Sequence, residues 1–180
     1  DKKTPIRHNV GSVKTGVNYV LIISSSAGLW AYNTGDTVAF VALSPPQIVV
    51  TGRHKQFISA FGEHVISSEV EGALKEAIKS SSLTINEFTV APKTSSKEGL
   101  SCHEWWIEFD VVPKEKDVKS LAKKLNQNLK MRNAYYKDLI DGKVLKDLEI
   151  IVVKKDTFKN YMKEIGKLGG QNKLPRLSND

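Results

Sequence analysis

The sequence predicts an α+β fold, with a small β-rich subdomain followed by an α/β sandwich domain whose helices pack on a sheet. Two observations support this fold. Short runs rich in β-branched residues, separated by tight turns, fill residues 17–50. Farther along the chain, residues 68–78 and 118–129 carry apolar side chains at helical spacing, with strand-like runs between and after them. Helices of this kind bury their apolar face against a sheet.

The first quarter of the chain is predicted to form strands at residues 17–24, 37–42 and 47–50, with a turn at Pro45 and Pro46 between the last two. The SSSAG segment after the first strand suggests a phosphate-binding loop. We reject that interpretation because no Gly-Lys-Ser/Thr follows and the segment opens no helix.

A helix is predicted to begin at Ser68, which has the spacing of a capping box with Glu71. We expect the apolar stripe of this helix to belong to the core, because its residues recur at i, i+3, i+4, i+7 and i+8. They are Val70, Ala73, Leu74, Ala77 and Ile78.

Two strands are predicted next, at residues 83–91 and 103–112, joined by a loop at 92–101. Successive side chains of a strand point to opposite faces, so at most one of Trp105 and Trp106 belongs to the core. The other tryptophan could stack on a ligand or cover a domain interface.

The last predicted elements are an amphipathic helix, an apolar strand at residues 148–153 and a short helix capped by Thr157. The apolar residues of the first helix are Val118, Leu121, Ala122, Leu125 and Leu129. Those of the short helix are Phe158, Tyr161, Met162 and Ile165.

The composition bounds the class of protein. With 180 residues, 40% of them hydrophobic and 26% charged, the chain is typical of one large or two small folded domains. The only cysteine is Cys102, which excludes an intramolecular disulfide and a cysteine-based metal site, and we predict no metal-binding residues. No apolar run reaches about 18 residues and there is no secretory signal pattern, so we expect a cytoplasmic protein that does not span a membrane.

The net charge of +7 favours anionic partners such as nucleotides, nucleic acid or phosphates. Many lysines, among them Lys119, Lys123 and Lys130, lie on predicted helix faces, where they can serve solubility alone. One alternative function is therefore a basic module that binds nucleic acid or an acidic protein, although nucleic acid is not the partner we expect.

The segment GGQNKLPR, at residues 169–176, holds one lysine between a pair of glycines and a proline. Glycine permits backbone conformations closed to other residues and proline fixes its own φ, so this loop can carry Lys173 to a defined place. An ammonium group suits a site where negative charge grows during a reaction. The alternative is a loose basic tail.

Two other polar residues lie in predicted turns. The carboxylate of Asp36 has two acceptor oxygens, which suits a pair of neighbouring hydroxyls such as those of a ribose, but an ordinary turn aspartate is the alternative. His64 could donate a proton or bind a ligand, although a lone histidine in a turn usually does neither.

Four segments carry a resemblance to a known family. They are GLWAYNTGDTV at residues 28–38, TGRHKQFISAFGEHVISSEVEGAL at 51–74, EIIVVKKDTFKNYM at 149–162 and GKLGGQNKLPRLSND at 166–180. In this order and spacing they resemble the C-terminal third of the adenylate-forming enzymes, and specifically the auxin-responsive acyl acid amido synthetases with their bacterial relatives. The resemblance covers nearly all of the chain from about Val17.

The resemblance implies a reaction in two halves. A carboxylic acid attacks the α-phosphate of ATP, which is accompanied by Mg²⁺, and an amine such as an amino acid then takes the acyl group from the adenylate. It implies that Asp36 holds the ribose hydroxyls, that Arg53 follows a hinge near Gly52, and that Lys173 acts in adenylation. Tyr32 is a candidate for lining the adenine or acyl pocket.

The resemblance also implies that residues 1–51 are the β-rich end of a large N-terminal adenylation domain and residues 52–180 a small mobile domain. The phosphate loop and acid pocket of such enzymes precede the TGD motif, and Asp1 is not a natural initiator. We therefore expect a piece of a longer chain, inactive without its large domain. Other superfamily members have an aspartate soon after the hinge arginine, where this chain has His54 and Lys55. The amido synthetases also lack that aspartate, so its absence is a feature of this branch. A catalytically silent regulatory domain of the same fold is the remaining alternative.

Overall fold

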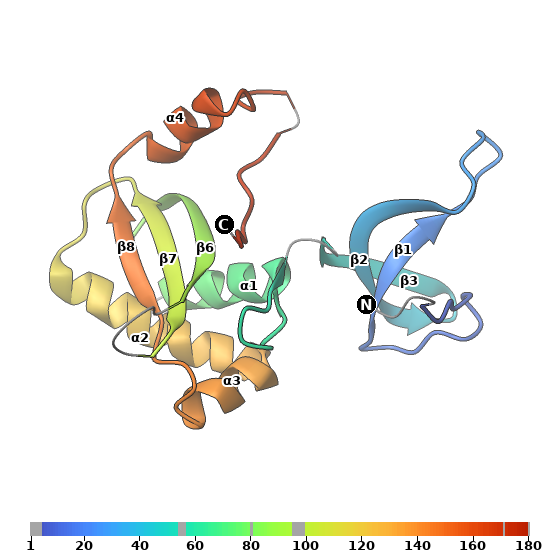
Figure 1. The fold of residues 1–180 in the computed structure, drawn as a ribbon, viewed down its shortest axis with the longest axis horizontal. Helices are drawn as coiled ribbons and strands as arrows, with labels where there is room; N and C mark the ends of the chain where they lie inside the picture. Colours follow the sequence, from blue (N-terminus) through green and yellow to red (C-terminus); the bar gives the residue numbers. More distant parts are fainter. Residues whose placement is uncertain (1–4, 54–56, 80, 95–99, 171, 180) are drawn as a thin grey trace. The chain divides into compact units, whose positions relative to one another are not determined.

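The computed structural model describes residues 5–53, 57–79, 81–94, 100–170 and 172–179. The chain forms two compact units, Asp1–Lys55 and Gln56–Asp180, which we describe one at a time. The first unit consists of strands and the second combines strands with helices (Figure 1). The fold is therefore α+β, as predicted.

The first unit is an antiparallel sheet of three strands in the order β1-β2-β3. They are β1 (Asn18–Ile23), β2 (Tyr32–Leu43) and β3 (Pro46–Arg53). Val38 in the middle of β2 is buried, and on the same strand Phe40 packs edge-on against Tyr19 of β1, with ring centroids 6.1 Å apart.

The connection between β1 and β2 is a loop at residues 24–31 that is closed by hydrogen bonds. The N–H of Ser25 donates to the carbonyl of Leu29 (2.9 Å), and the N–H of Ala31 donates to the Ser24 hydroxyl (3.0 Å). The chain then enters β2 at Tyr32, so the serine-rich segment does not open a helix. This geometry agrees with the rejection of a phosphate loop.

The second unit begins with a two-stranded antiparallel sheet of β4 (Phe57–Ile58) and β5 (Val65–Ile66), which leads directly into α1 (Ser67–Ile78). Its main sheet has the order β6-β7-β8 and consists of β6 (Ile85–Lys93), β7 (Cys102–Phe109) and β8 (Glu149–Val153).

Strands β6 and β7 are antiparallel, whereas β7 and β8 are parallel. A parallel pair needs a crossover connection, and here the crossover contains α2 (Glu115–Arg132) and α3 (Ala134–Asp141). Helix α4 (Thr157–Glu164) follows β8 and leads to a tail that returns to β6 (Figure 1). No helix among the described residues is long and apolar enough to cross a membrane.

The core of the second unit lies between the main sheet and helices α1 and α2 (Figure 1). Trp105 is fully buried and stacks on Phe88, with ring centroids 5.7 Å apart, while Trp106 is 39% exposed on the opposite face of β7. This confirms that only one of the two tryptophans belongs to the core. The buried apolar residues of α1 and α2 all belong to the predicted stripes: Val70, Ala73, Leu74, Ala77, Leu121, Leu125 and Leu129.

The predicted capping box of Ser68 and Glu71 is wrong. Helix α1 begins one residue earlier than predicted, so the third helical position is Glu69. The carboxylate of Glu69 accepts the N–H of Ile66 (3.0 Å) and so satisfies one of the donors that every helix start leaves unpaired.

Thr157 does not cap α4 as predicted. It is the first residue of the helix, and its hydroxyl donates to the carbonyl of Lys154 (2.7 Å). The cap position belongs to Asp156, whose φ of 63° lies in the left-handed region that aspartate tolerates better than most residues. The turn that precedes α4 therefore decides where the helix begins.

We expect Leu129→Ala to destabilise the second unit by about 2–5 kcal/mol, because truncating this fully buried side chain leaves a cavity between α2 and the sheet. Met131, on the same helix, is 76% exposed, so Met131→Ala should change the free energy of unfolding by less than about 0.5 kcal/mol. Urea unfolding followed by tryptophan fluorescence measures both variants. Similar losses in the two would contradict the core described here.

Candidate functional site

Thr34, Gly35 and Asp36 form a bulge within β2 and not the turn expected from the sequence. The pairing with β1 leaves these three residues opposite Leu21 alone. Gly35 has a φ of 78°, a conformation open to glycine without steric cost. The Thr34 hydroxyl donates to the Leu21 carbonyl (3.2 Å) and accepts the N–H of Asp36 (3.2 Å). These bonds fix the backbone that carries the aspartate.

The three nucleotide-binding candidates lie on two neighbouring strands of one sheet. The pairing of β2 with β3 places Arg53 opposite Asp36, and Asp36 is half-buried. Tyr32 is the first residue of β2 and is 52% exposed. The sheet thus places Asp36 and Arg53 opposite each other, with Tyr32 at the start of β2, the strand that also carries Asp36. His54 and Lys55 lie outside the described residues.

Lys173 belongs to the second unit and lies in the segment between α4 and the tail, where its side chain is exposed. Gly169 and Gly170 have φ values of 95° and 62°, which non-glycine residues rarely adopt. Both the N–H and the side-chain amide of Asn172 donate to the Gly169 carbonyl (3.4 and 3.3 Å). The predicted loop with two glycines before the lysine is therefore present, with Gln171 outside the described residues.

The chain that follows Pro175 lies along the outer edge of β6. The N–H of Val90 donates to the carbonyl of Arg176 (3.0 Å), and the N–H of Ser178 donates back to the carbonyl of Val90 (2.9 Å). Leu177 forms a parallel bridge with Val90 and is buried. The lysine loop thus has one end built into the sheet, and this part of the tail is not loose.

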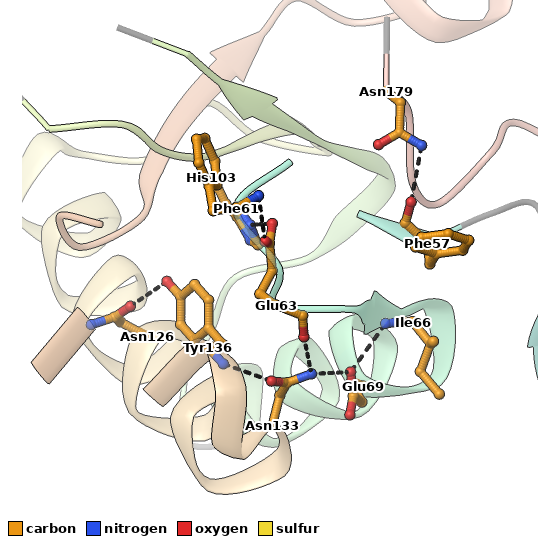
Figure 2. Close-up of polar contacts among 10 residues, drawn as sticks. All are labelled: Phe57, Phe61, Glu63, Ile66, Glu69, His103, Asn126, Asn133, Tyr136 and Asn179. Atoms are coloured by element: carbon orange, nitrogen blue, oxygen red, sulfur yellow. Dashed lines mark hydrogen bonds and ion pairs between the residues drawn. The ribbon is translucent and has the colours of Figure 1, made fainter. Parts of the chain in front are cut away.

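A buried polar network holds residues 59–64, the connection between β4 and β5 (Figure 2). Glu63 and His103 of β7 are both fully buried, and Glu63 Oε1 lies 2.8 Å from His103 Nε2. The other carboxylate oxygen accepts the N–H of Phe61 (2.9 Å). The His103 ring also packs against Tyr136 of α3, with ring centroids 5.1 Å apart.

Asn133 extends this network to two helices (Figure 2). Its side-chain nitrogen donates to the carbonyl of Glu63 (3.1 Å) and to the carboxylate of Glu69 (3.0 Å). Its side-chain oxygen accepts the N–H of Tyr136 (2.7 Å) and so caps α3. The Tyr136 hydroxyl donates to Asn126 of α2 (2.7 Å). One asparagine therefore ties the β4–β5 connection to α1 and α3.

Burial acts on the pKa of side chains in this unit, among them Glu63 and Cys102. It raises the pKa of Glu63, but the hydrogen bonds from His103 and from the backbone outweigh burial and leave that pKa below its ordinary value of 4.5. Burial also raises the pKa of the Cys102 thiol. A buried, protonated thiol is a poor nucleophile, so Cys102 is a structural residue.

His64 lies between two fully buried residues, Glu63 and Val65, yet its own side chain is exposed. Its φ of 47° is uncommon for a residue with a side chain, and its ring lies 5.6 Å from that of Phe57. Among the described residues there is no group of three His, Cys, Asp or Glu side chains that could hold a metal ion.

The polar network was missed from the sequence because its members are distant along the chain. Glu63 and His103 are 40 residues apart, and Glu63 and Asn133 are 70 apart. The one local signal was Asn133 directly before the AYYKDLI run, since asparagine is a favoured N-cap residue. This asparagine predicts a helix start at the place of α3, a helix that is absent from the sequence-based prediction.

Two family models match this chain, the GH3 family central domain over residues 2–53 and the GH3 family C-terminal domain over residues 68–180. One relative is the jasmonoyl–L-amino acid synthetase GH3.5 of Oryza sativa subsp. japonica, which is 27% identical over 175 residues. The match covers 93% of this chain and 29% of the relative. The chain thus spans less than a third of the length of this protein.

Solved structures with a similar fold include the following two. The GH3.15 acyl acid amido synthetase matches with a TM-score of 0.76 and 21% identity, over 96% of this chain and 34% of that chain. A 2-hydroxyisobutyryl-CoA ligase in the postadenylation state, in complex with R3-HIB-AMP, matches with a TM-score of 0.57 and 11% identity, over 93% of this chain and 33% of that chain. At these identities the similarity establishes the fold alone.

We expect the stability of the second unit to fall as the pH drops below about 4.5, because the lowered pKa of Glu63 stabilises the folded state only while the carboxylate is ionised. The contribution is present above the unfolded pKa and is lost as the pH falls through the folded pKa. Glu63→Gln should flatten this dependence, whereas Glu164→Gln, at an exposed position, should not. Urea unfolding between about pH 3 and pH 6 measures the slopes. An unaltered slope in Glu63→Gln would contradict the assignment.

Proposed function

The chain belongs to the GH3 family, and we propose that it is the C-terminal part of an ATP-dependent acyl acid amido synthetase. A carboxylate oxygen of the acid attacks the α-phosphorus of ATP, which gives an acyl-adenylate and pyrophosphate. An amine nitrogen then attacks the acyl carbon, and an amide, AMP and a proton are released. The observation that carries this proposal is the match of family models to both units of the chain.

The proposed substrates are a carboxylic acid and an amine. The rice relative is named as a synthetase that joins a jasmonoyl group to an L-amino acid, and the GH3.15 protein as an acyl acid amido synthetase. On this basis we propose an amino acid as the amine. The acid is proposed by class alone, because its pocket is expected in the large N-terminal domain of the longer protein.

We propose that residues 1–51 belong to that large domain and residues 52–180 form a small domain that moves relative to it. The pairing of Gly52 with Thr37 continues β3 past the proposed boundary, and the compact units divide between Lys55 and Gln56. These observations favour a hinge that lies just after β3. This chain contains neither the phosphate loop nor the acid pocket expected of such enzymes, so we do not expect it to catalyse the reaction alone.

The proposed role of Asp36 is to accept hydrogen bonds from the two ribose hydroxyls of ATP. The bulge supports this role because the Thr34 hydroxyl bonds both to the Leu21 carbonyl of β1 and to the N–H of Asp36, and so fixes the aspartate backbone. Arg53, opposite on β3, is proposed to lie at the border of the two domains, and Tyr32 to line the adenine or acyl pocket.

The proposed role of Lys173 is to stabilise the α-phosphoryl group during adenylation. Negative charge builds on the phosphoryl oxygens as the carboxylate attacks, and a fixed cation at that place lowers the barrier. The lysine is exposed, it follows flexible glycines, and the chain beyond it is attached to β6. Movement of the small domain would bring this cation to the nucleotide and withdraw it afterwards.

Magnesium is proposed to arrive with ATP. The described residues offer no cluster of ligands for a resident ion, and Mg²⁺ on a nucleotide is held mainly by phosphate oxygens, waters and one or two carboxylates. The ion supplies further positive charge at the phosphates.

We expect Lys173→Ala in the full-length enzyme to lower ATP–pyrophosphate exchange by about 100-fold or more, because the mutant lacks the cation beside the α-phosphate. The assay uses a panel of aliphatic, aromatic and jasmonate-type carboxylic acids. Lys167→Ala is the matched control, since Lys167 is an exposed lysine of the same segment.

Exchange that survives in Lys173→Ala would remove the lysine from the mechanism. Absence of exchange with every acid, together with binding of nucleic acid that weakens steeply with salt, would favour the basic binding module instead.

We expect Asp36→Asn to raise the KM for ATP by roughly 10- to 100-fold, because charge-assisted hydrogen bonds to the ribose become neutral ones. Asparagine keeps the shape of the side chain, so the bulge should persist and the thermal unfolding curve should match that of the wild type. A test with 2′-deoxy-ATP shows whether the ribose contact is the cause, because Asp36→Asn should raise the KM for this analogue less than the KM for ATP. An equal effect on both nucleotides would contradict the ribose contact.

A further inference from the structure

Arg176 follows Lys173 by three residues and links the tail to two elements of the second unit. Its Nε donates to Glu71 of α1 (3.1 Å), and its Nη1 forms an ion pair with Glu87 of β6 and donates to the Phe88 carbonyl (3.1 Å). The guanidinium carbon lies 4.6 Å from the centroid of the Phe88 ring. A single planar group thus meets two carboxylates, a carbonyl and an aromatic face.

This arrangement is stronger than an ordinary surface ion pair. An exposed pair contributes little because water screens it and two long side chains lose freedom. The Arg176 side chain is only 30% exposed, and its contacts come from different directions around one rigid plane. Hydrogen bonds to charged groups, with stacking on an aromatic ring, fix the orientation of the guanidinium.

The backbone around Arg176 is attached as well. The Thr89 hydroxyl donates to the Pro175 carbonyl (2.8 Å), Leu177 is buried against β6, and the side chain of Asn179 donates to the carbonyl of Phe57 (2.9 Å). The attachment therefore runs without interruption from Pro175 to Asn179.

The chain on the other side of Lys173 has the opposite character. Gly166, Gly169 and Gly170 all have left-handed φ values, of 69°, 95° and 62°. Glycine loses more conformational freedom on ordering than any other residue, so this side contributes little to fixing the lysine. Each residue spans at most about 3.6 Å, which keeps the Cα of Lys173 within roughly 11 Å of the Cα of Arg176.

We propose that Arg176 is a positioning residue for adenylation, which fixes where Lys173 can reach by fastening the tail to α1 and β6. This inference rests on the proposed function of Lys173. Arg176 does not touch the substrates in this role; it acts through the lysine. Loss of the anchor leaves the lysine charged but badly placed, and a misplacement of about 1 Å can reduce a rate by about 100-fold.

The proposal distinguishes arginine from lysine at position 176. An ammonium group is a point charge without a flat face, so it cannot pair with both carboxylates in fixed directions and also stack on Phe88. Arg176→Lys keeps the positive charge but loses the planar group that contacts Glu71, Glu87 and the Phe88 ring together. It should therefore behave more like Arg176→Ala than like the wild type.

The test uses the full-length enzyme with Arg176→Ala, Arg176→Lys and Glu87→Gln, and with Arg7→Ala as a control that removes an exposed arginine from the first unit. Adenylation is measured by ATP–pyrophosphate exchange, with the acid from the panel above that gives the highest rate. Acyl transfer is measured separately, from synthetic acyl-adenylate and an amino acid. Hydrogen exchange of the Val90 and Ser178 amides reports whether the tail stays on β6.

We expect both Arg176 variants to lower pyrophosphate exchange by about 10- to 100-fold, with acyl transfer changed by less than about 3-fold. Glu87→Gln should give a smaller loss in the same assay, and Arg7→Ala none. The two amides should exchange faster in Arg176→Ala while the far-UV circular dichroism is unchanged. If Arg176→Ala fails to fold, Arg176→Lys and Glu87→Gln make the same comparison.

Unchanged pyrophosphate exchange in the folded Arg176 variants would overturn the proposal, as would an equal loss in both half-reactions, which indicates a structural role alone. The Lys173→Ala variant separates the two levels of inference. If it retains exchange, the proposed role of the lysine fails. If it loses exchange while the Arg176 variants do not, only the positioning role fails.

Discussion

The buried pair of Glu63 and His103 is the constraint on which the second unit depends. A carboxylate removed from water is tolerated only with hydrogen bonds to its oxygens, and Glu63 has them from His103 and from its own loop. Removing one partner of such a buried pair typically costs about 3–5 kcal/mol. Through Asn133 the same network fixes the positions of α1 and α3. Hydrogen bonds therefore hold the β4–β5 connection at the start of the second unit, whereas apolar packing holds the core of that unit.

The two units hold the side chains proposed to act on the nucleotide in different ways. In the first unit a bulge fixes Asp36 inside a sheet, where the backbone has little freedom. In the second unit Lys173 lies on a loop with one flexible and one attached end. This difference fits the proposed reaction, in which the acceptor of the ribose stays in place and the cation approaches the phosphates and is then withdrawn.

The sequence predicted correctly those features of the fold that depend on residues close together in the chain. The helical stripes of α1 and α2 and the alternation of Trp105 and Trp106 were correct because periodic burial is visible in the sequence. The predicted capping role of Glu71 was wrong because α1 begins one residue earlier, which gives the third helical position to Glu69. The actual partner of Glu71 is Arg176, which lies 105 residues away, so no local pattern indicates it. The place of Asp36 in a bulge depends on its pairing with β1, which the TGD motif does not reveal. The network around Glu63 was missed for the same reason.

The attachment of the tail to β6 has a second consequence, for the behaviour of the protein in solution. An edge strand with unpaired N–H and C=O groups is a template for pairing with other chains, and the tail occupies both groups of Val90 on that edge. Leu177, buried in the same contact, would become an apolar surface if the tail were released. Proteolysis or truncation before Pro175 would therefore expose both an unpaired strand edge and an apolar side chain, so the segment that carries the lysine loop also covers an edge that could pair with other chains.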